Sequence, residues 1–207
     1  MPRAQTPGAV AAAPTPPAQE LARRVDEHYN RMRTLAVPFT ETYNGMGMER
    51  VERGRLLLAK PGRMRWDYAQ PAGKVFVMDG KFAYAYTPGD AQAQRYPAKK
   101  LDDFRSPLRL LLGHTRVEKE LDRLSVAPEG ENFKLRGIPR GLQQRVAQVE
   151  LTVTPDGRIL DMRWRETDGS TTEFRLGQEA ANLPMPRDAF LFQAPPGVVV
   201  VPGLPPI

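Results

Sequence analysis

The chain of 207 residues is 41% hydrophobic, contains no cysteine and carries a formal net charge of +6. This length and apolar content are enough for one domain with a complete hydrophobic core, while the lack of cysteine excludes disulfides and thiolate metal sites. The positive charge suits acidic partners, which include anionic lipid headgroups, acidic proteins and nucleic acid, without choosing among them.

The first 18 residues are rich in alanine, proline and threonine and have little to bury, so they are predicted to form a disordered tail. Arg3 followed by residues 8–13 also resembles the remnant of a secretory signal peptide, although this apolar part is shorter than the roughly 7 to 15 residues of a complete signal. Both interpretations stay open. Residues 19–203 are predicted to form a single domain. No apolar run approaches the roughly 20 residues that cross a bilayer, so we expect a soluble protein.

Residues 20–35 show the spacing of an amphipathic helix, with apolar side chains three and four positions apart and charged ones mostly opposite. The apolar positions are Leu21, Val25, Tyr29, Met32 and Leu35. We expect Pro38 to follow the end of this helix and residues 39–43 to begin a sheet. His28 is interpreted as a residue on the helix surface.

Residues 52–88 predict a β-meander, because apolar and polar side chains alternate and turn residues separate the runs. Met64, Trp66 and Tyr68 alternate with charged residues, and Phe82, Tyr84 and Tyr86 alternate with alanines. Turns are expected at residues 60–62, 70–71 and 79–80, where proline, glycine and an Asp-Gly pair occur.

The second half combines a short helix with further strands. Ser106 is a candidate N-cap for an apolar helix within residues 103–112, and residues 117–121 could add a second short turn. Strands are expected at residues 91–97, 124–127, 133–138, 147–154, 158–166 and 171–178. Leu151 and Trp164 each share a face with apolar neighbours, which predicts an antiparallel sheet with one face exposed to water.

The apolar face of these strands favours large side chains, and a sheet of about ten strands must curl because its twist accumulates. Only the two predicted helices are available to cover the concave side, and two helices about 10 Å across cannot densely fill it. We therefore expect interior apolar volume for a ligand. A barrel packed solid by its own side chains under a capping helix is the alternative that the pattern leaves open.

The order A-K-P-G-R-M-R-W-x-Y, then Q-P, then V-x-V-x-D-G-K, then an aromatic strand closing in Y-x-P resembles the periplasmic outer-membrane lipoprotein carrier family, LolA. The resemblance extends from the helix near Leu21 to F-x-A-P-P-G-V-x-V at residues 192–200. It implies a mainly β fold with an α lid, in which an unclosed antiparallel half-barrel is covered by short helices, as in LolA and LolB. The absence of a lipobox cysteine separates the chain from the outer-membrane lipoprotein that shares this fold and acts as the carrier's receptor.

The same resemblance implies a periplasmic carrier that holds the acyl chains of lipoproteins in a hydrophobic cavity and shuttles them from the inner to the outer membrane. No bond is made or broken, so no enzyme activity, catalytic residue or cofactor is expected. The implied partners are acylated lipoproteins, an inner-membrane ABC-type lipoprotein-releasing transporter, and an outer-membrane receptor or an anionic membrane surface, with the carrier acting as a monomer. The alternatives are a lipid-sensing or envelope-stress regulatory module of the same fold, and a structural β-domain without a cavity.

The resemblance and the alternation together select the site residues. The predicted cavity wall consists of Trp66, Tyr68, Phe82, Tyr84, Tyr86, Leu151 and Trp164, and the predicted lid contains Leu108, Leu111 and Leu112. Lys60 stands where many family members have an arginine that hydrogen-bonds the lid backbone and holds the empty carrier closed. Lysine lacks the planar guanidinium, so this contact is expected to be looser or absent. Ordinary core packing and a solvated turn lysine are the competing interpretations.

Arginines at every second position, opposite the apolar residues, are expected to lie on the outer convex face. They form the doublets Arg53/Arg55, Arg63/Arg65 and Arg163/Arg165. We interpret them as a salt-bridged surface or as a docking patch; because they do not interleave with aromatics on one face, a nucleic-acid partner is not expected. The two histidines, His28 and His114, lack metal-ligand spacing, and no nucleotide-binding or hydrolase motif occurs, so we predict no metal site.

Overall fold

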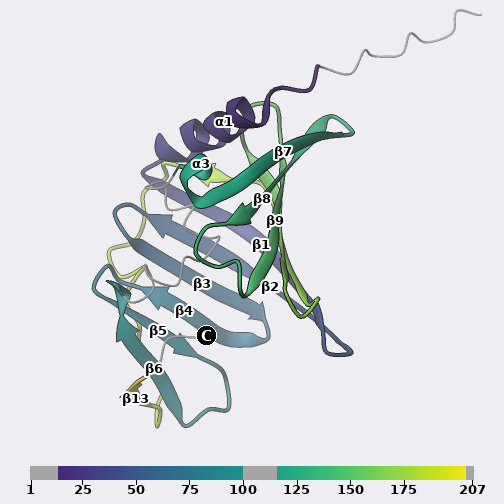
Figure 1. Ribbon diagram of the computed structural model, residues 1–207. Helices are drawn as coiled ribbons and strands as arrows, with labels where there is room; N and C mark the ends of the chain where they lie inside the picture. The colour runs from purple at the N-terminus through teal and green to yellow at the C-terminus, as the bar shows by residue number, and fades with distance from the viewer. Residues whose placement is uncertain (1–13, 100–115, 204–207) are drawn as a thin grey trace, which may run out of the picture.

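The computed structural model describes residues 14–99 and 116–203 and shows one curved, mostly antiparallel sheet with two short helices (Figure 1). The strand order is β13-β6-β5-β4-β3-β2-β1-β11-β10-β9-β8-β7, with β12 pairing to β1. The path does not close on itself. The expected mainly β, unclosed sheet is therefore confirmed, with the short β13 as a parallel addition to β6.

The first half of the described chain contains one helix and six strands. They are α1 (Ala18–Asn30), β1 (Thr34–Gly45), β2 (Met48–Ala59), β3 (Arg63–Gln70), β4 (Ala72–Met78), β5 (Phe82–Tyr86) and β6 (Gln92–Pro97). The second half contains α3 (Val117–Glu120), β7 (Leu121–Glu129), β8 (Asn132–Pro139), β9 (Val146–Val153), β10 (Ile159–Glu166), β11 (Thr171–Leu176), β12 (Ala180–Ala181) and β13 (Val199–Pro202).

The turns predicted from proline and glycine lie between the expected strands. At the β4–β5 hairpin, the Asp79 carboxylate accepts the backbone N–H groups of Lys81 and Phe82, both at 2.7 Å. Gly80 adopts a positive φ of 100°, which glycine tolerates without strain. Local turn chemistry therefore stabilises the β4–β5 hairpin where the sequence predicts it.

The predicted end of the first helix is wrong. Helix α1 ends at Asn30, and both Leu35 and Pro38 lie in β1. Pairing on one side of β1 passes from β12 at Ala36 to β11 at Phe39, so Pro38 lies where that ladder is interrupted. Its carbonyl accepts the N–H of Gly177 at 2.8 Å. A proline without an N–H donor is tolerated at such an interruption.

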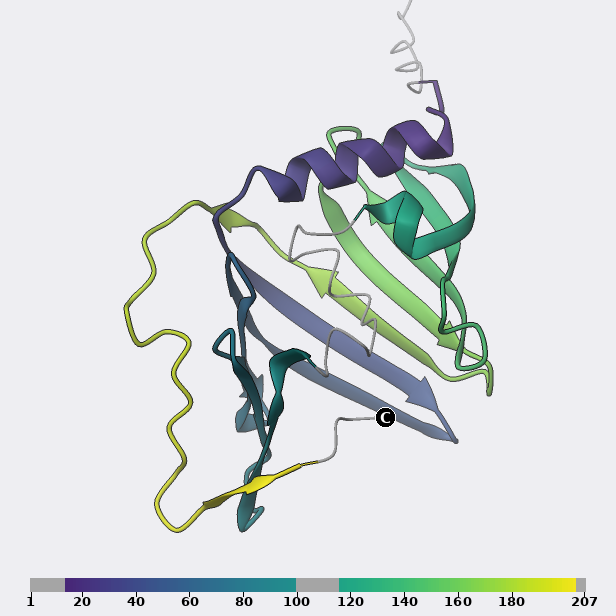
Figure 2. The ribbon, with the colours of Figure 1, turned by 60° about the vertical axis from the view of Figure 1, so that its left-hand side comes forward.

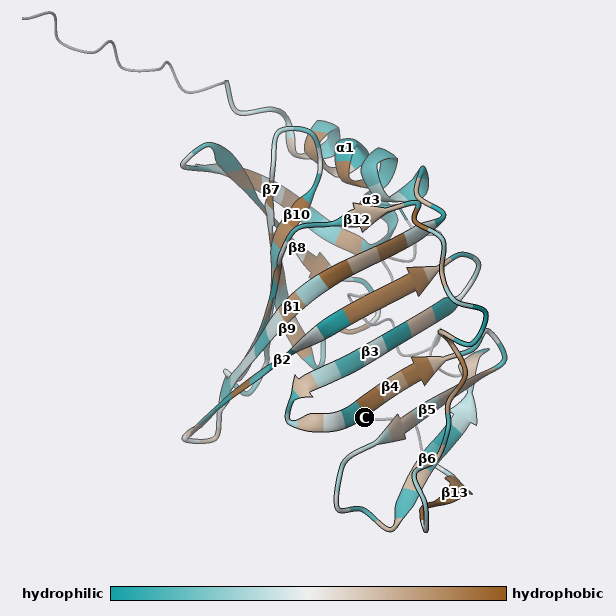
Figure 3. Ribbon diagram, turned by 180° about the vertical axis from the view of Figure 1, so that it is seen from behind, coloured by the Kyte–Doolittle hydropathy of each residue, from teal (hydrophilic) through white to brown (hydrophobic). Residues whose placement is uncertain are grey.

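The sheet has a concave and a convex side, and both are partly covered. Helices α1 and α3 lie over one end of the concave side, whereas a segment without regular secondary structure, residues 183–198, runs outside β3–β6 (Figure 2). We call this stretch the C-terminal segment. The one-face-wet prediction is therefore incomplete, because part of the convex side is buried as well. Continuous hydrophobic stretches run along β2 and β4 (Figure 3).

Candidate functional site

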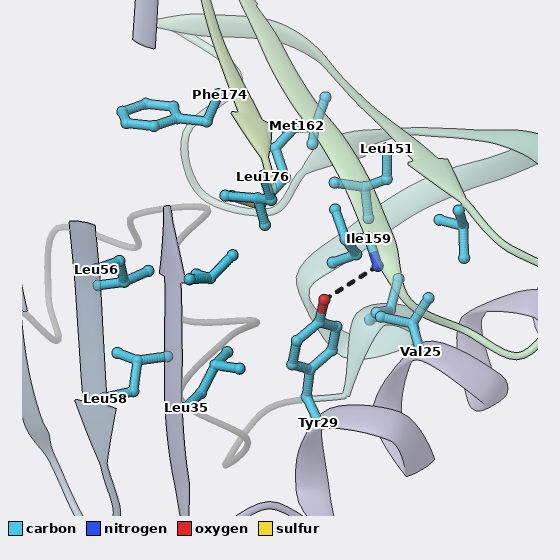
Figure 4. Close-up of a cluster of buried hydrophobic side chains, with 14 of the residues drawn as sticks. Val25, Tyr29, Leu35, Leu56, Leu58, Leu151, Ile159, Met162, Phe174 and Leu176 are labelled. Atoms are coloured by element: carbon cyan, nitrogen blue, oxygen red, sulfur yellow. Dashed lines mark hydrogen bonds between the residues drawn. The ribbon is translucent and has the colours of Figure 1, made fainter. Parts of the chain in front are cut away.

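The concave side gathers the apolar side chains of both halves of the sheet beneath α1. Leu21, Val25 and Tyr29 of α1 face this surface and are at most 1% exposed. The strands contribute Leu35, Leu56, Leu58, Leu151, Ile159, Met162, Phe174 and Leu176 to the same buried cluster (Figure 4). The amphipathic pattern of residues 20–35 therefore correctly predicts which side of the helix is buried.

Farther along the concave side, aromatic rings from four strands form one cluster. Trp66 lies with its ring centroid 4.6 Å from that of Phe39 and 5.2 Å from that of Phe174. Trp164 stacks on the other side of Phe174 at 5.2 Å, and Tyr68 meets Phe39 edge to face at 5.1 Å. Trp164 and Tyr68 are only half-buried. The cluster therefore presents aromatic surface that the protein's own packing leaves partly uncovered.

Four of the seven predicted wall residues, Trp66, Tyr68, Leu151 and Trp164, face the concave side. The placement of the other three, Phe82, Tyr84 and Tyr86, is wrong.

The β4–β5 register explains this error. Register pairs Met78 with Ala83 and Phe76 with Ala85, so the alanines of β5 face the concave core and its aromatics face outward. Ala83 is fully buried, while Tyr84 stacks on Phe192 of the C-terminal segment at 5.1 Å. Alternation shows which residues share a face but not which face is inside.

The concave side becomes polar at the end away from α1. The Tyr68 hydroxyl donates to Glu41 at 3.0 Å, and Lys74 pairs with Glu52, which is only 5% exposed. Burial raises the pKa of Glu41, and burial together with the nearby Glu41 carboxylate raises the pKa of Tyr68. A hydrocarbon lying along the concave side would therefore meet an apolar surface under α1, then aromatic rings, then charged groups.

Lys60 connects the β2–β3 turn to the end of α1. Its ammonium donates to the carbonyl oxygens of Tyr29 at 2.6 Å and Asn30 at 3.1 Å. Both carbonyls lie in the last turn, where the regular helical hydrogen bonds end, and the Tyr29 carbonyl also accepts the N–H of Met32 at 3.2 Å. A cation at this end of the helix also interacts favourably with the helix dipole. The lysine thus makes backbone contacts of the kind that the resemblance implies for the family arginine, and it makes them to α1. The predicted lid residues Leu108, Leu111 and Leu112 lie outside the described residues.

A buried polar cluster that the sequence analysis missed also fixes α1. The Tyr29 hydroxyl donates to Glu179 at 2.6 Å and accepts the N–H of Ile159 at 3.0 Å, and His28 Nε2 lies 2.8 Å from the same carboxylate. His28 is 7% exposed, so its interpretation as a surface residue is wrong. Its partner lies 151 positions away, and no local pattern indicates a contact over that separation. Burial, together with the charge of Glu179, raises the pKa of Tyr29.

The arginine doublets lie on the convex side, as expected from their alternation. Arg65 pairs with Asp67 at 2.7 Å and Arg163 pairs with Glu173.

Within residues 14–99 and 116–203, no group of three or more potential metal-ligating side chains gathers, and no helix is long and apolar enough to span a bilayer.

Comparison with known proteins finds sequence similarity to outer-membrane lipoprotein carrier proteins. The family model described as outer membrane lipoprotein carrier protein LolA matches residues 30–193. The outer-membrane lipoprotein carrier protein of Chromobacterium violaceum is 28% identical over 199 residues, 96% of each chain. That of Bordetella avium is 31% identical over 155 residues, 72% of this chain and 71% of the relative.

Solved structures share the fold at low sequence identity. An uncharacterized conserved protein from Thermus thermophilus has a TM-score of 0.56 and 17% identity, with 90% of this chain and 99% of that chain covered. MucB has a TM-score of 0.51 and 17% identity, with 86% of this chain and 63% of that chain covered. At these identities the likeness concerns the fold alone.

Proposed function

The chain belongs to the LolA family of outer membrane lipoprotein carrier proteins, and we propose that it carries lipoproteins by binding their acyl chains against the concave side of its sheet. The family is one of transport proteins without enzyme activity. The observation that carries the proposal is the aromatic cluster around Phe174, which lies beside the apolar surface under α1 and includes the half-exposed Trp164.

The task of such a carrier is to keep hydrocarbon out of water. Each buried methylene contributes about 0.8 kcal/mol, so a lipid with several acyl chains is nearly insoluble without a host. Aromatic side chains supply large apolar area with few rotatable bonds, which limits the entropy lost on binding. The half-exposed rings of Trp164 and Tyr68 therefore suit reversible binding of a hydrocarbon ligand.

Lys60 gives α1 a fixed but reversible position in this proposal. Two hydrogen bonds from one ammonium contribute to holding the helix end, and a rotation of the lysine side chain breaks both of them. The Tyr29–Glu179 contact lies on the same turn of α1 and holds it to the other half of the sheet. We propose that α1 and the predicted lid at Leu108, Leu111 and Leu112 together cover the acyl chains.

The proposed route runs through the periplasm, from an inner-membrane ABC-type lipoprotein-releasing transporter to an outer-membrane receptor or an anionic membrane surface. The names of the curated relatives support the lipoprotein cargo. The net charge of +6 is compatible with delivery to acidic surfaces.

The test is mass spectrometry of material that co-purifies with the full chain from the native cell envelope. We expect enrichment of acylated lipoproteins over free phospholipid, and loss of that enrichment in Trp164→Lys. Tyr84→Lys, on the convex side, serves as the matched control and should retain the cargo. Enrichment of free lipid without lipoprotein would instead favour the lipid-sensing module, and the absence of both would contradict the carrier.

A further inference from the structure

A cavity of about 570 Å³ lies on the convex side, between the sheet and the C-terminal segment. Its sheet wall includes Arg55 and Leu57 of β2 and Arg65 of β3, and its outer wall includes Asp188 and Leu191. This volume lies within the range of about 300 to 1,000 Å³ typical of small-molecule sites. The cavity is separated by the sheet itself from the proposed acyl-binding surface.

The outer wall is held in place by aromatic and polar contacts. Phe190 is 4% exposed, with the guanidinium of Arg63 5.3 Å from its ring centroid. Phe192 stacks on Tyr84 with an angle of 11° between the rings. Arg65 donates to the carbonyl oxygen of Leu191 at 3.2 Å. The cavity is therefore bounded by a segment that the convex side anchors on either side of Leu191.

The charged side chains that line the cavity differ in whether they have an ion-pair partner. Arg65 is neutralised by Asp67, whose two carboxylate oxygens accept from its Nε at 2.8 and 2.7 Å. Arg55 and Asp188, in contrast, make no side-chain hydrogen bond or ion pair with any residue of the described ranges, although both line the cavity. They come from opposite walls. Both side chains are exposed to solvent, so the cavity offers a cation on one wall and an anion on the other, neither paired within the part of the chain that the structure describes.

We propose that this cavity binds a zwitterionic amphiphile with one hydrocarbon chain, such as a single-chain phospholipid with a phosphate and an ammonium group. The guanidinium of Arg55 matches the geometry of phosphate oxygens, and the carboxylate of Asp188 accepts from the ammonium group. The hydrocarbon chain lies between Leu57 and Val75 of the sheet and Leu191 of the C-terminal segment. A purely anionic ligand would leave Asp188 unpaired, and a purely apolar one would leave both charges unpaired.

Calorimetric titration of the full chain with a dodecyl lysophosphatidylethanolamine, below its micelle concentration, tests the proposal. We expect Arg55→Gln and Asp188→Asn each to weaken binding by about tenfold, a change of about 1.4 kcal/mol. Arg53→Gln is the matched control, because Arg53 is exposed on the same side of β2 outside the cavity, and its affinity should stay within about twofold.

Other ligands and variants test separately the contributions of the headgroup charges, the hydrocarbon chain and the side of the sheet. The phosphoglycerol analogue should bind less tightly than the phosphoethanolamine one, and equal affinity would overturn the role of Asp188. Phosphoethanolamine alone should bind more weakly, because it lacks the hydrocarbon chain. Binding as tight as that of the lipid would mean that the site takes a free zwitterion, which would overturn the proposal. Because the dodecyl chain also suits the proposed acyl-binding surface, the titrations are repeated in Trp164→Lys, where the remaining binding should still weaken about tenfold with Arg55→Gln. Binding that Trp164→Lys abolishes and Arg55→Gln leaves unchanged would place the lipid on the concave side and overturn the proposal while leaving the carrier function intact.

Discussion

At the scale of single residues, Lys60 is the clearest link between a sequence position and a mechanical role. Its ammonium satisfies two carbonyls at the end of α1 from a turn 30 positions farther along the chain. We expect Lys60→Met, which keeps the aliphatic stem, to lower the free energy of unfolding by about 1 to 2 kcal/mol.

Hydrogen exchange of the α1 backbone should report the local effect of this change. Amides of the last helical turn should exchange faster in Lys60→Met, and Lys60→Arg should restore their protection because a guanidinium can donate to the same carbonyls. Unchanged protection in Lys60→Met would show that the two hydrogen bonds do not hold the helix.

Asp161 makes stability depend on pH. Burial, followed by the charge of the neighbouring Glu173, raises the pKa of Asp161 to about 7. The folded state then keeps a proton that the unfolded state releases, so the free energy of unfolding should fall as pH rises from about 4 to about 7. Asp161→Asn stays neutral throughout and should be more stable than the native chain by about 1 kcal/mol at pH 8, after allowance for solvent screening.

Urea unfolding at pH 5 and pH 8 measures this difference. The two proteins should be nearly equal at pH 5 and diverge at pH 8. Asp90→Asn, at an exposed turn, is the control and should follow the native chain at both values. A native chain that gains stability between pH 5 and pH 8 relative to Asp161→Asn would reverse the predicted sign.

At the scale of elements, the β9–β10 turn is shaped to receive α1. Gly157 has a φ of +95°, and a Cβ added there would lie 2.2 Å from the backbone oxygen of Arg24 in α1. Gly169, in the β10–β11 turn, has nearly the same φ of +91° but no heavy atom within 4 Å of an added Cβ. The two glycines therefore separate backbone strain from helix packing.

We expect Gly169→Ala to cost about 1 kcal/mol of unfolding free energy from strain alone. Gly157→Ala should cost at least about 2 kcal/mol more, because backbone atoms of α1 cannot move aside as a flexible side chain would. Chemical denaturation of both variants checks this. Equal losses would mean that α1 does not pack against this turn.

Tyr29 joins three elements, since its hydroxyl contacts Glu179 near β12 and the N–H of Ile159 in β10. Tyr29→Phe leaves a buried N–H without its acceptor, so a loss of about 1 to 3 kcal/mol is expected in urea unfolding. Tyr86→Phe removes a hydroxyl that forms no hydrogen bond within the described ranges, and it should change stability by less than about 0.5 kcal/mol.

For the whole molecule, period-two alternation and turn residues predict the strands well, because both are local properties. They do not specify on which side of the sheet a face lies. In β5 the alanines pack inside and the aromatics outside, since the large side chains of neighbouring strands fill the concave side and the C-terminal segment covers the other. A usable signal was present: continuous apolar runs at residues 56–59 and 75–78 are typical of strands buried on both faces.

The contacts of the candidate site were less predictable than its strands. Alternation groups Trp66 with Met64 and Tyr68 on one face, and the place of Lys60 before Pro61 in a family motif singles out that lysine. The partnership of Tyr29 and Glu179 depends on how a helix crosses two distant strands, and spacing along the chain contains no information about it. The same holds for the cavity around Arg55, whose outer wall comes from the far end of the sequence.

One variant on each side of the sheet tests on which side hydrocarbon binds. Trp164→Lys places an ammonium beside Phe174 on the concave side, where desolvating the charge opposes an acyl chain, so affinity for a fluorescent diacylglycerol should fall about tenfold or more. Tyr84→Lys removes ring contacts with Phe192 and Phe82 on the convex side and should leave that affinity within about twofold. Thermal unfolding of both variants controls for misfolding. The ligand has no charge, so it does not engage Arg55 or Asp188. If Tyr84→Lys lowered the affinity more than Trp164→Lys, the acyl chains would have to bind on the convex side, contrary to the proposal.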